Sequence, residues 1–133
     1  MSLQFWLAFA AYLLPTFPLG YFWHLRAFKT RYDALEMLRD DVFIPMGLGS
    51  MVLQGLLFAW AYPLLFAPTE WFWSTGALGF FVFAGLLSWS FQVLPVAAKY
   101  RMASVPAFVA LESAFVALHF AVVSPLIALA YAM

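Results

Sequence analysis

The stretch SVPAFVALESAFVALHFAVVSPLIALAY, residues 104–131, decides the fold of this protein. Glu112 is its one charged residue, and nearly all of its other side chains are apolar. About 20 consecutive apolar residues are enough to cross the hydrocarbon core of a bilayer as an α-helix. Residues 104–131 are therefore predicted to form a transmembrane helix.

Three other apolar runs have a similar length, and they cover residues 3–23, 43–66 and 72–97. One long polar connection, 24–42, joins the first two runs, whereas the other connections are short turns. Such a chain leaves no room for a separate soluble domain. We therefore expect residues 1–133 to form one all-α domain, an antiparallel four-helix bundle that spans a membrane.

The composition supports this class of protein and argues against others. The chain is 67% hydrophobic and 9% charged, whereas soluble domains have about half apolar and about one quarter charged residues. Its formal net charge is zero, which argues against nucleic acid as a partner, because binding to phosphates needs an excess of positive charge. The chain has no cysteine, and therefore no disulfide and no thiolate metal site.

No nucleotide-binding, zinc-protease or hydrolase motif occurs in the sequence. The two histidines, His24 and His119, are expected at heights that differ by about 20 Å, so the two would not hold one haem. We therefore expect no catalytic residue, no metal and no cofactor.

The connection 24–42 has the pattern of an amphipathic helix. Its apolar residues recur at steps of three and four, and they are Leu25, Phe28, Tyr32, Leu35 and Leu38. The expected ion pairs on its other faces are Lys29 with Asp33 and Glu36 with Arg39. We predict either a short helix at the membrane surface or an extension of the first helix. Its basic and acidic residues balance, which favours a simple connector over a platform for anionic lipids.

All Lys and Arg residues lie on one side of the predicted membrane. They are Arg26, Lys29, Arg31 and Arg39 in the first connection, and Lys99 and Arg101 in the third. Under the positive-inside rule, these connections are cytoplasmic and both termini lie outside. We therefore predict a multi-pass protein of the bacterial inner membrane with periplasmic termini. The aromatic residues expected near the outer surface are Trp6, Trp60, Tyr62, Trp71, Trp73 and Tyr131, and those near the inner surface are Tyr21, Trp23 and Tyr100.

Polar residues inside the predicted spans are the candidate ligand-binding residues, because placing them in a bilayer is costly. They are Gln54, Ser88, Gln92, Glu112 and His119. Glu112 and His119 share one helix face but lie about 10 Å apart along the axis, too far for a direct hydrogen bond. We expect Gln54, Gln92 and Glu112, with His119, to meet in one interior cluster. Such a cluster is either a set of structural hydrogen bonds or a ligand site or proton relay.

Small side chains form a second face of residues 104–131, which we call the alanine seam. It contains Ala107, Ala110, Ala114, Ala117 and Ala121, at alternating steps of three and four. This seam lies about 170° away from Glu112 and His119. If the acidic face points into its own bundle, the seam can pack closely on a second copy of the protein. Alternatively, another helix of the same chain covers the seam, or the seam faces lipid.

Several short motifs follow one another in a characteristic order. They are Phe22-Trp23-His24-Leu25, Phe28-Lys29 and Tyr32 near the end of the first run, residues 45–55 with Ala61-Tyr62-Pro63 in the second, Ala97-Ala98-Lys99 after the third, and residues 111–120 in the fourth. This order resembles that of a family of small bacterial membrane proteins of unknown function. The resemblance implies a four-helix inner-membrane protein. It implies no reaction, so no catalytic residue is carried over.

Three functions are compatible with these features. The leading hypothesis is a non-enzymatic membrane protein that binds or transports a small molecule or lipid in an interior cavity near Glu112. The second is an accessory or scaffold subunit of a larger membrane complex, which the alanine seam favours. The third is a lipid-modifying membrane enzyme with Glu112 and His119 as acid and base, for which the sequence contains no motif.

Overall fold

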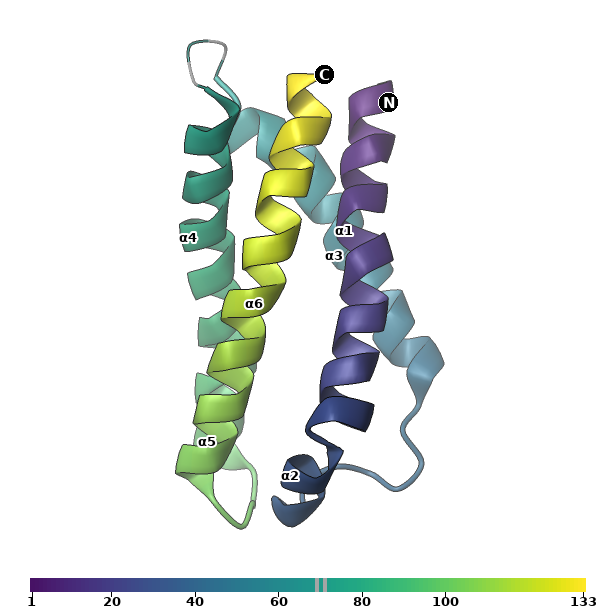
Figure 1. Cartoon of the computed structure of the whole chain (residues 1–133), viewed down its shortest axis with the longest axis vertical. Coiled ribbons are helices and arrows are strands. Elements are labelled where there is room, and N and C mark those ends of the chain that lie inside the picture. Colours follow the sequence, from purple (N-terminus) through teal and green to yellow (C-terminus); the bar gives the residue numbers. More distant parts are fainter. Residues whose placement is uncertain (69, 71) are drawn as a thin grey trace.

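Four long helices run antiparallel to one another in the computed structural model of the chain (Figure 1). They are α1 (Leu3–Phe22), α3 (Ile44–Leu65), α4 (Trp73–Gln92) and α6 (Val105–Ala132). The structure describes residues 1–68, 70 and 72–133, which contain no strand, and the aromatic position predicted at Trp71 lies outside them. All four helices, with their continuations, are long and apolar enough to cross a membrane. The predicted all-α, multi-pass membrane fold is confirmed.

The second and fourth predicted runs, 43–66 and 104–131, become α3 and α6 almost without change. The first span continues beyond α1 as a π-helix, η1 (Trp23–Ala27), which leads into the short helix α2 (Lys29–Ala34). The third span is interrupted at Val93, between α4 and α5 (Leu94–Lys99). Pro95 explains this interruption, because proline has no amide hydrogen for the helical hydrogen bond and crowds the preceding turn.

The central helix of the bundle is α6. It packs against α4 on one side and α1 on the other, and α1 in turn packs against α3 (Figure 1). Within the most apolar window of each span, 44% of the residues of α6 are buried, compared with 17% for α3. α3 is therefore the most loosely packed of the long helices.

One aromatic ring from each long helix meets in the core. The Phe58 ring of α3 lies 5.3 Å from the Tyr12 ring of α1, measured between centroids. The same ring lies 5.2 Å from Phe80 of α4 and 5.9 Å from Phe120 of α6. All three pairs have an edge-to-face geometry, which places the positive edge of one ring against the negative face of the other. This cluster joins all four long helices.

Both termini lie at one end of the bundle (Figure 1), where α3 and α4 approach each other closely at Gly76. At Gly76, near the start of α4, an added Cβ would overlap with the Phe66 carbonyl oxygen and the Tyr62 hydroxyl at the end of α3. Tyr62 stacks on Tyr131 of α6 with a centroid distance of 5.5 Å. The Tyr131 hydroxyl also donates a 2.5 Å hydrogen bond to the Ala59 carbonyl. The ends of α3, α4 and α6 are thus joined here.

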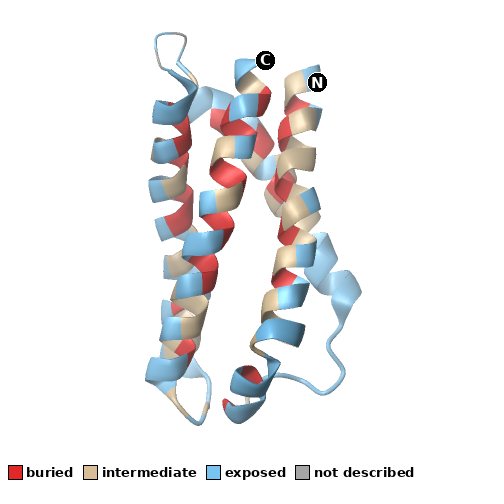
Figure 2. Cartoon of the chain, viewed as in Figure 1, coloured by how far each residue is buried: buried red, intermediate tan, exposed pale blue. Residues whose placement is uncertain are grey.

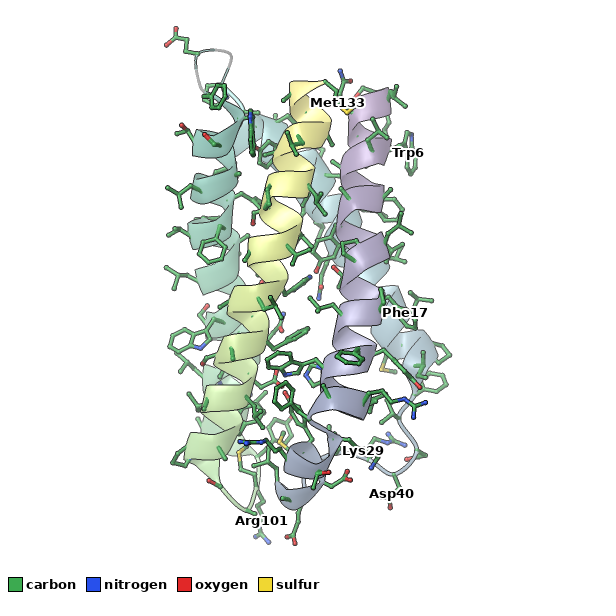
Figure 3. All side chains as sticks on the ribbon, in the orientation of Figure 1. Trp6, Phe17, Lys29, Asp40, Arg101 and Met133 are labelled. Carbon is green, nitrogen blue, oxygen red and sulfur yellow. The ribbon has the colours of Figure 1, made fainter. Side chains whose placement is uncertain are left out.

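The opposite end of the bundle, formed by residues 24–42 and 99–104, is called the charged end below. Figure 3 shows Lys29, Asp40 and Arg101 at this end and Trp6 and Met133 at the other. Here α3 diverges from the bundle, and every residue from 41 to 50 is exposed (Figure 2). The divergence leaves space between α3 and α1.

The amphipathic pattern predicted for the connection holds over its first part. Tyr32 and Leu35 are buried, as the apolar stripe requires. The helix ends after Ala34, because Glu36 has a φ of 57°, a left-handed conformation that cannot continue a right-handed helix.

This early helix end changes one of the two predicted ion pairs. Lys29 and Asp33, which lie within α2, form the predicted pair at 2.6 Å. The predicted pair between Glu36 and Arg39 is wrong, because the chain beyond Glu36 is not helical. Arg39 instead binds Asp41 at 3.0 Å, and this bond lowers the pKa of the Asp41 carboxyl.

Candidate functional site

A first polar group forms where Glu112 of α6 meets the segment that follows α1. Glu112 Oε1 accepts a 2.5 Å hydrogen bond from the Tyr32 hydroxyl and lies 2.9 Å from Nε2 of His24. The Trp23 indole N–H donates a 3.1 Å hydrogen bond to the Tyr32 hydroxyl oxygen. We call Glu112, His24, Tyr32 and Trp23 the Glu112 cluster.

His24 belongs to η1, the π-helical segment after α1. Single π-helical turns are rare and occur frequently at functional sites. Nδ1 of His24 lies 2.9 Å from the carbonyl oxygen of Gly20. This contact holds the imidazole ring so that Nε2 points toward α6 and Glu112.

These contacts locate the protons of the Glu112 cluster. A carbonyl oxygen can only accept, so His24 Nδ1 carries a hydrogen. The Tyr32 hydroxyl accepts from Trp23 and directs its own hydrogen to Glu112. One further proton lies between His24 Nε2 and Glu112 Oε1, since two bare acceptors at 2.9 Å would repel each other. The pair is therefore an imidazolium with a carboxylate or an imidazole with a carboxylic acid, and both forms have zero net charge.

The Glu112 cluster is largely shielded within the chain. The side chain of Glu112 is 13% exposed and that of His24 is 26% exposed. Tyr32, outside the spans, is buried, and its burial together with its hydrogen bond to Glu112 raises the pKa of the phenol. Tyr32 therefore stays protonated and remains a hydrogen-bond donor to Glu112.

A second polar group links α6, α1 and α3 farther from the charged end. Thr16 Oγ1 donates a 2.5 Å hydrogen bond to the Tyr12 carbonyl and lies 2.7 Å from Nε2 of His119. Because the Thr16 hydroxyl has a single hydrogen, His119 Nε2 is the donor in their contact. The Tyr12 hydroxyl donates a 2.7 Å hydrogen bond to Gln54 Oε1. We call these four residues the His119 chain.

The ring of Phe115 lies between the two polar groups. Its centroid is 4.7 Å from that of His24 and 5.6 Å from that of His119. A phenyl ring neither donates nor accepts a transferable proton. The two groups are therefore separate hydrogen-bonded units, and the residues that form them provide no continuous proton relay.

An apolar cavity of about 260 Å³ lies between α1 and α3 at the charged end. We call it the α1–α3 cavity. Its walls include Phe17, Gly20, Gly47, Leu48, Met51 and Phe115. His24 also lines this cavity, so the Glu112 cluster contributes a polar side chain to an otherwise mostly apolar wall.

The single interior cluster predicted from the sequence is wrong. Glu112 and His119 belong to the two separate groups described above. Gln54 binds Tyr12 and so joins the His119 chain, not Glu112. The prediction used only the positions of these residues along their helices, but hydrogen bonding also depends on the rotation of each helix about its axis.

The two candidate residues of α4 join neither polar group. Gln92 is exposed and Ser88 is half-buried. α4 instead meets α6 through Trp89, whose indole N–H donates a 2.8 Å hydrogen bond to the Ser113 hydroxyl. This contact sets the rotation of α4 and leaves Gln92 on the outer surface.

Sequence reasoning missed His24, Tyr32, Thr16 and Tyr12 as members of these groups. His24 was expected at the membrane surface, apart from the polar residues of the spans. One usable signal was the position of Tyr32 on the apolar stripe of the connection, which indicated a buried hydroxyl in need of a partner.

The alanine seam is exposed along the part of α6 nearer the charged end. Its exposed members are Ala107, Ala110, Ala114, Ala117 and Ala121. Ser124 and Ala128, which continue the same three–four spacing beyond Ala121, are buried. Ala107, Ala110 and Ala114 line a pocket at the charged end together with residues of η1 and α2, among them Trp23 and Ala34.

Among the described residues, no three His, Cys, Asp or Glu side chains come close enough to hold a metal ion. Comparisons with protein-family models, curated proteins and solved structures found no match to this chain. The resemblance to a family of small bacterial membrane proteins stays a prediction. The Glu112 cluster and the α1–α3 cavity are therefore the basis for a proposed function.

Proposed function

We propose that this protein binds a lipid or another amphiphilic small molecule in the α1–α3 cavity, beside the Glu112 cluster. The main support for this proposal is the position of His24, which lines the cavity and also contacts Glu112. Apolar walls with a few well-placed polar groups are the usual composition of a small-molecule site. Because α3 diverges from the bundle here, an apolar chain can enter sideways from the bilayer.

Binding is favoured over catalysis by the separation of the two candidate acid–base residues. A shared reaction would require Glu112 and His119 within hydrogen-bond reach of one substrate. They instead belong to different polar groups, with Phe115 between them. The protein is therefore proposed to be a non-enzymatic binding protein.

The proposal includes the orientation inferred from the basic residues. The charged end faces the cytoplasm of a bacterial cell, and both termini lie on the periplasmic side of the inner membrane. The ligand then comes from the cytoplasmic leaflet, where the α1–α3 cavity lies.

Replacing Gly47 with leucine tests the cavity. Gly47 lines it, and an added Cβ would meet no heavy atom within 4 Å, so a side chain can start there without a clash, and we expect leucine to fill part of the cavity. We expect the lipid retained by the purified protein, measured by native mass spectrometry, to fall at least about tenfold, which corresponds to a loss of about 1.4 kcal/mol of binding free energy.

Gly49→Leu is the matched control for this variant. Gly49 also lies near the start of α3, with no heavy atom within 4 Å of an added Cβ, but it does not line the cavity. Both substitutions raise helix propensity equally, so a difference between them reports the cavity. Equal lipid retention in the two variants contradicts the proposed site.

An oligomeric scaffold is a second candidate function, and the exposed alanine seam is the observation in its favour. The chain has no cysteine of its own. A single introduced cysteine can therefore form a disulfide only with the same cysteine of a second copy, and that disulfide shows that the two positions lie close together. Ala114→Cys is expected to give a disulfide-linked dimer in membranes treated with a mild oxidant, if two seams pack together. Leu78→Cys, on the exposed face of α4, is the control and is expected to stay monomeric. A monomer in both variants removes the seam as a dimer interface.

A further inference from the structure

A second cavity, of about 420 Å³, adjoins the α1–α3 cavity at the charged end, and we call it the polar cavity. The two cavities share Leu25, Leu38 and Val42 in their walls. Tyr32 lines the polar cavity and His24 lines the apolar one, and both side chains contact Glu112. A charged space and an apolar space thus meet side by side, as the headgroup and the tail of a lipid do.

The lining of the polar cavity has both signs of charge. Its basic residues are Lys29 and Arg39, and its acidic residues are Asp33, Glu36 and Asp40, so the formal sum is one negative charge. Lys29 pairs with Asp33, and Arg39 pairs with Asp41. Among the described residues, Glu36 and Asp40 take part in no ion pair. These two carboxylates are the groups that a ligand cation can engage.

We propose that the ligand is a phospholipid whose headgroup carries a phosphate and a primary ammonium, as in phosphatidylethanolamine. This inference rests on the proposed binding function and names its ligand class. The ammonium lies at Glu36 and Asp40, the phosphate lies near Lys29 and Arg39, and one acyl chain enters the α1–α3 cavity. A primary ammonium offers three N–H donors, and its hydrogen bonds to carboxylates are strengthened by charge.

The same lining disfavours the other common headgroups. A quaternary ammonium has no N–H and is typically held by a cage of aromatic rings. Within the described chain, Tyr32 is the one aromatic residue that lines the polar cavity. An anionic headgroup without an amine would meet a net negative wall. The charges therefore select a zwitterionic headgroup with a primary amine.

The test is competition among three lipids with identical oleoyl chains, phosphatidylethanolamine, phosphatidylcholine and phosphatidylglycerol, on the full chain in detergent. Native mass spectrometry is expected to show the ethanolamine lipid retained at least about tenfold over each of the others, the ratio that one charge-assisted hydrogen bond supplies. The double variant Glu36→Gln/Asp40→Asn keeps side-chain size and is expected to bring the ethanolamine-to-choline ratio close to one.

Glu70→Gln is the control for neutralising an exposed carboxylate elsewhere, since Glu70 lies away from the charged end, in the turn between α3 and α4. It is expected to keep the wild-type preference. Equal retention of the three lipids by the wild type, or a preference that survives in the double variant, overturns the headgroup assignment. Gly47→Leu then separates the two proposals. If it still lowers retention of all three lipids, the binding function stands without the headgroup assignment, whereas unchanged retention removes both.

Discussion

Replacing Glu112 with alanine is expected to lower the free energy of unfolding by about 3 kcal/mol, the upper end of the cost of leaving a buried polar group without its partner. The substitution removes the carboxyl oxygen that contacts both His24 Nε2 and the Tyr32 hydroxyl. Nε2 of His24 and the hydroxyl hydrogen of Tyr32 would then stay largely buried without a partner, which is more costly than losing the bonds themselves. Unfolding in mixed detergent, followed by circular dichroism, measures this loss.

Glu112→Gln is the informative comparison, because its side chain has the same shape. Both contacts of Glu112 are made by Oε1, so the amide must turn for its oxygen to accept from Tyr32 while its N–H donates to a neutral imidazole of His24. We expect a loss of only about 1 kcal/mol, since the bilayer favours the uncharged form of the pair. A loss as large as that of the alanine variant would show that the pair is ionised. No loss in either variant would show that the cluster does not stabilise the bundle.

The same two variants test whether Glu112 also serves ligand binding. Lipid retention is measured at a temperature where both variants are folded, so stability does not enter the comparison. We expect the alanine variant to retain less lipid than the wild type, because His24 loses the partner that holds its ring at the cavity wall. Wild-type retention in a folded alanine variant would restrict Glu112 to a structural role.

The fold was predictable because the length of an apolar run is a local property. Residues 104–131 also include the N-cap of their helix, since the Ser104 hydroxyl accepts a hydrogen bond from the Ala107 amide at the first turn of α6. The break at Val93 was not predicted, although Pro95 indicates a possible bend there. Whether a proline bends, ends or merely joins two helices depends on what packs around it, and the apolar pattern does not contain that information.

The partners of Glu112 were not predictable in the same way. Depth counted at about 1.5 Å per residue from each helix end places Glu112 well inside the membrane and His24 at its surface. In the structure the two side chains lie 2.9 Å apart. The first span continues through η1 to Ala27, which draws His24 into the helix. The Ala103 amide donates a 3.0 Å hydrogen bond to the Leu35 carbonyl, so α6 begins level with the segment after α2, not with the end of α1.

Replacing Gly76 with alanine is expected to destabilise the protein by about 3 kcal/mol, the upper end of the usual cost of overpacking. The new Cβ would overlap with the Phe66 carbonyl oxygen and the Tyr62 hydroxyl. The first of these is a backbone atom and cannot rotate away, and Tyr62 is held by stacking on Tyr131. The start of α4 must therefore move away from the end of α3.

Gly47→Ala separates this steric effect from the effect of helix propensity. Alanine is favoured over glycine in a helix by about 0.5–1 kcal/mol, and at Gly47 the added Cβ meets no heavy atom within 4 Å. This control is therefore expected to leave stability unchanged or raise it slightly, in the same detergent unfolding experiment. If Gly76→Ala were as stable as Gly47→Ala, α3 and α4 could not approach each other as closely as described at the end that carries the termini.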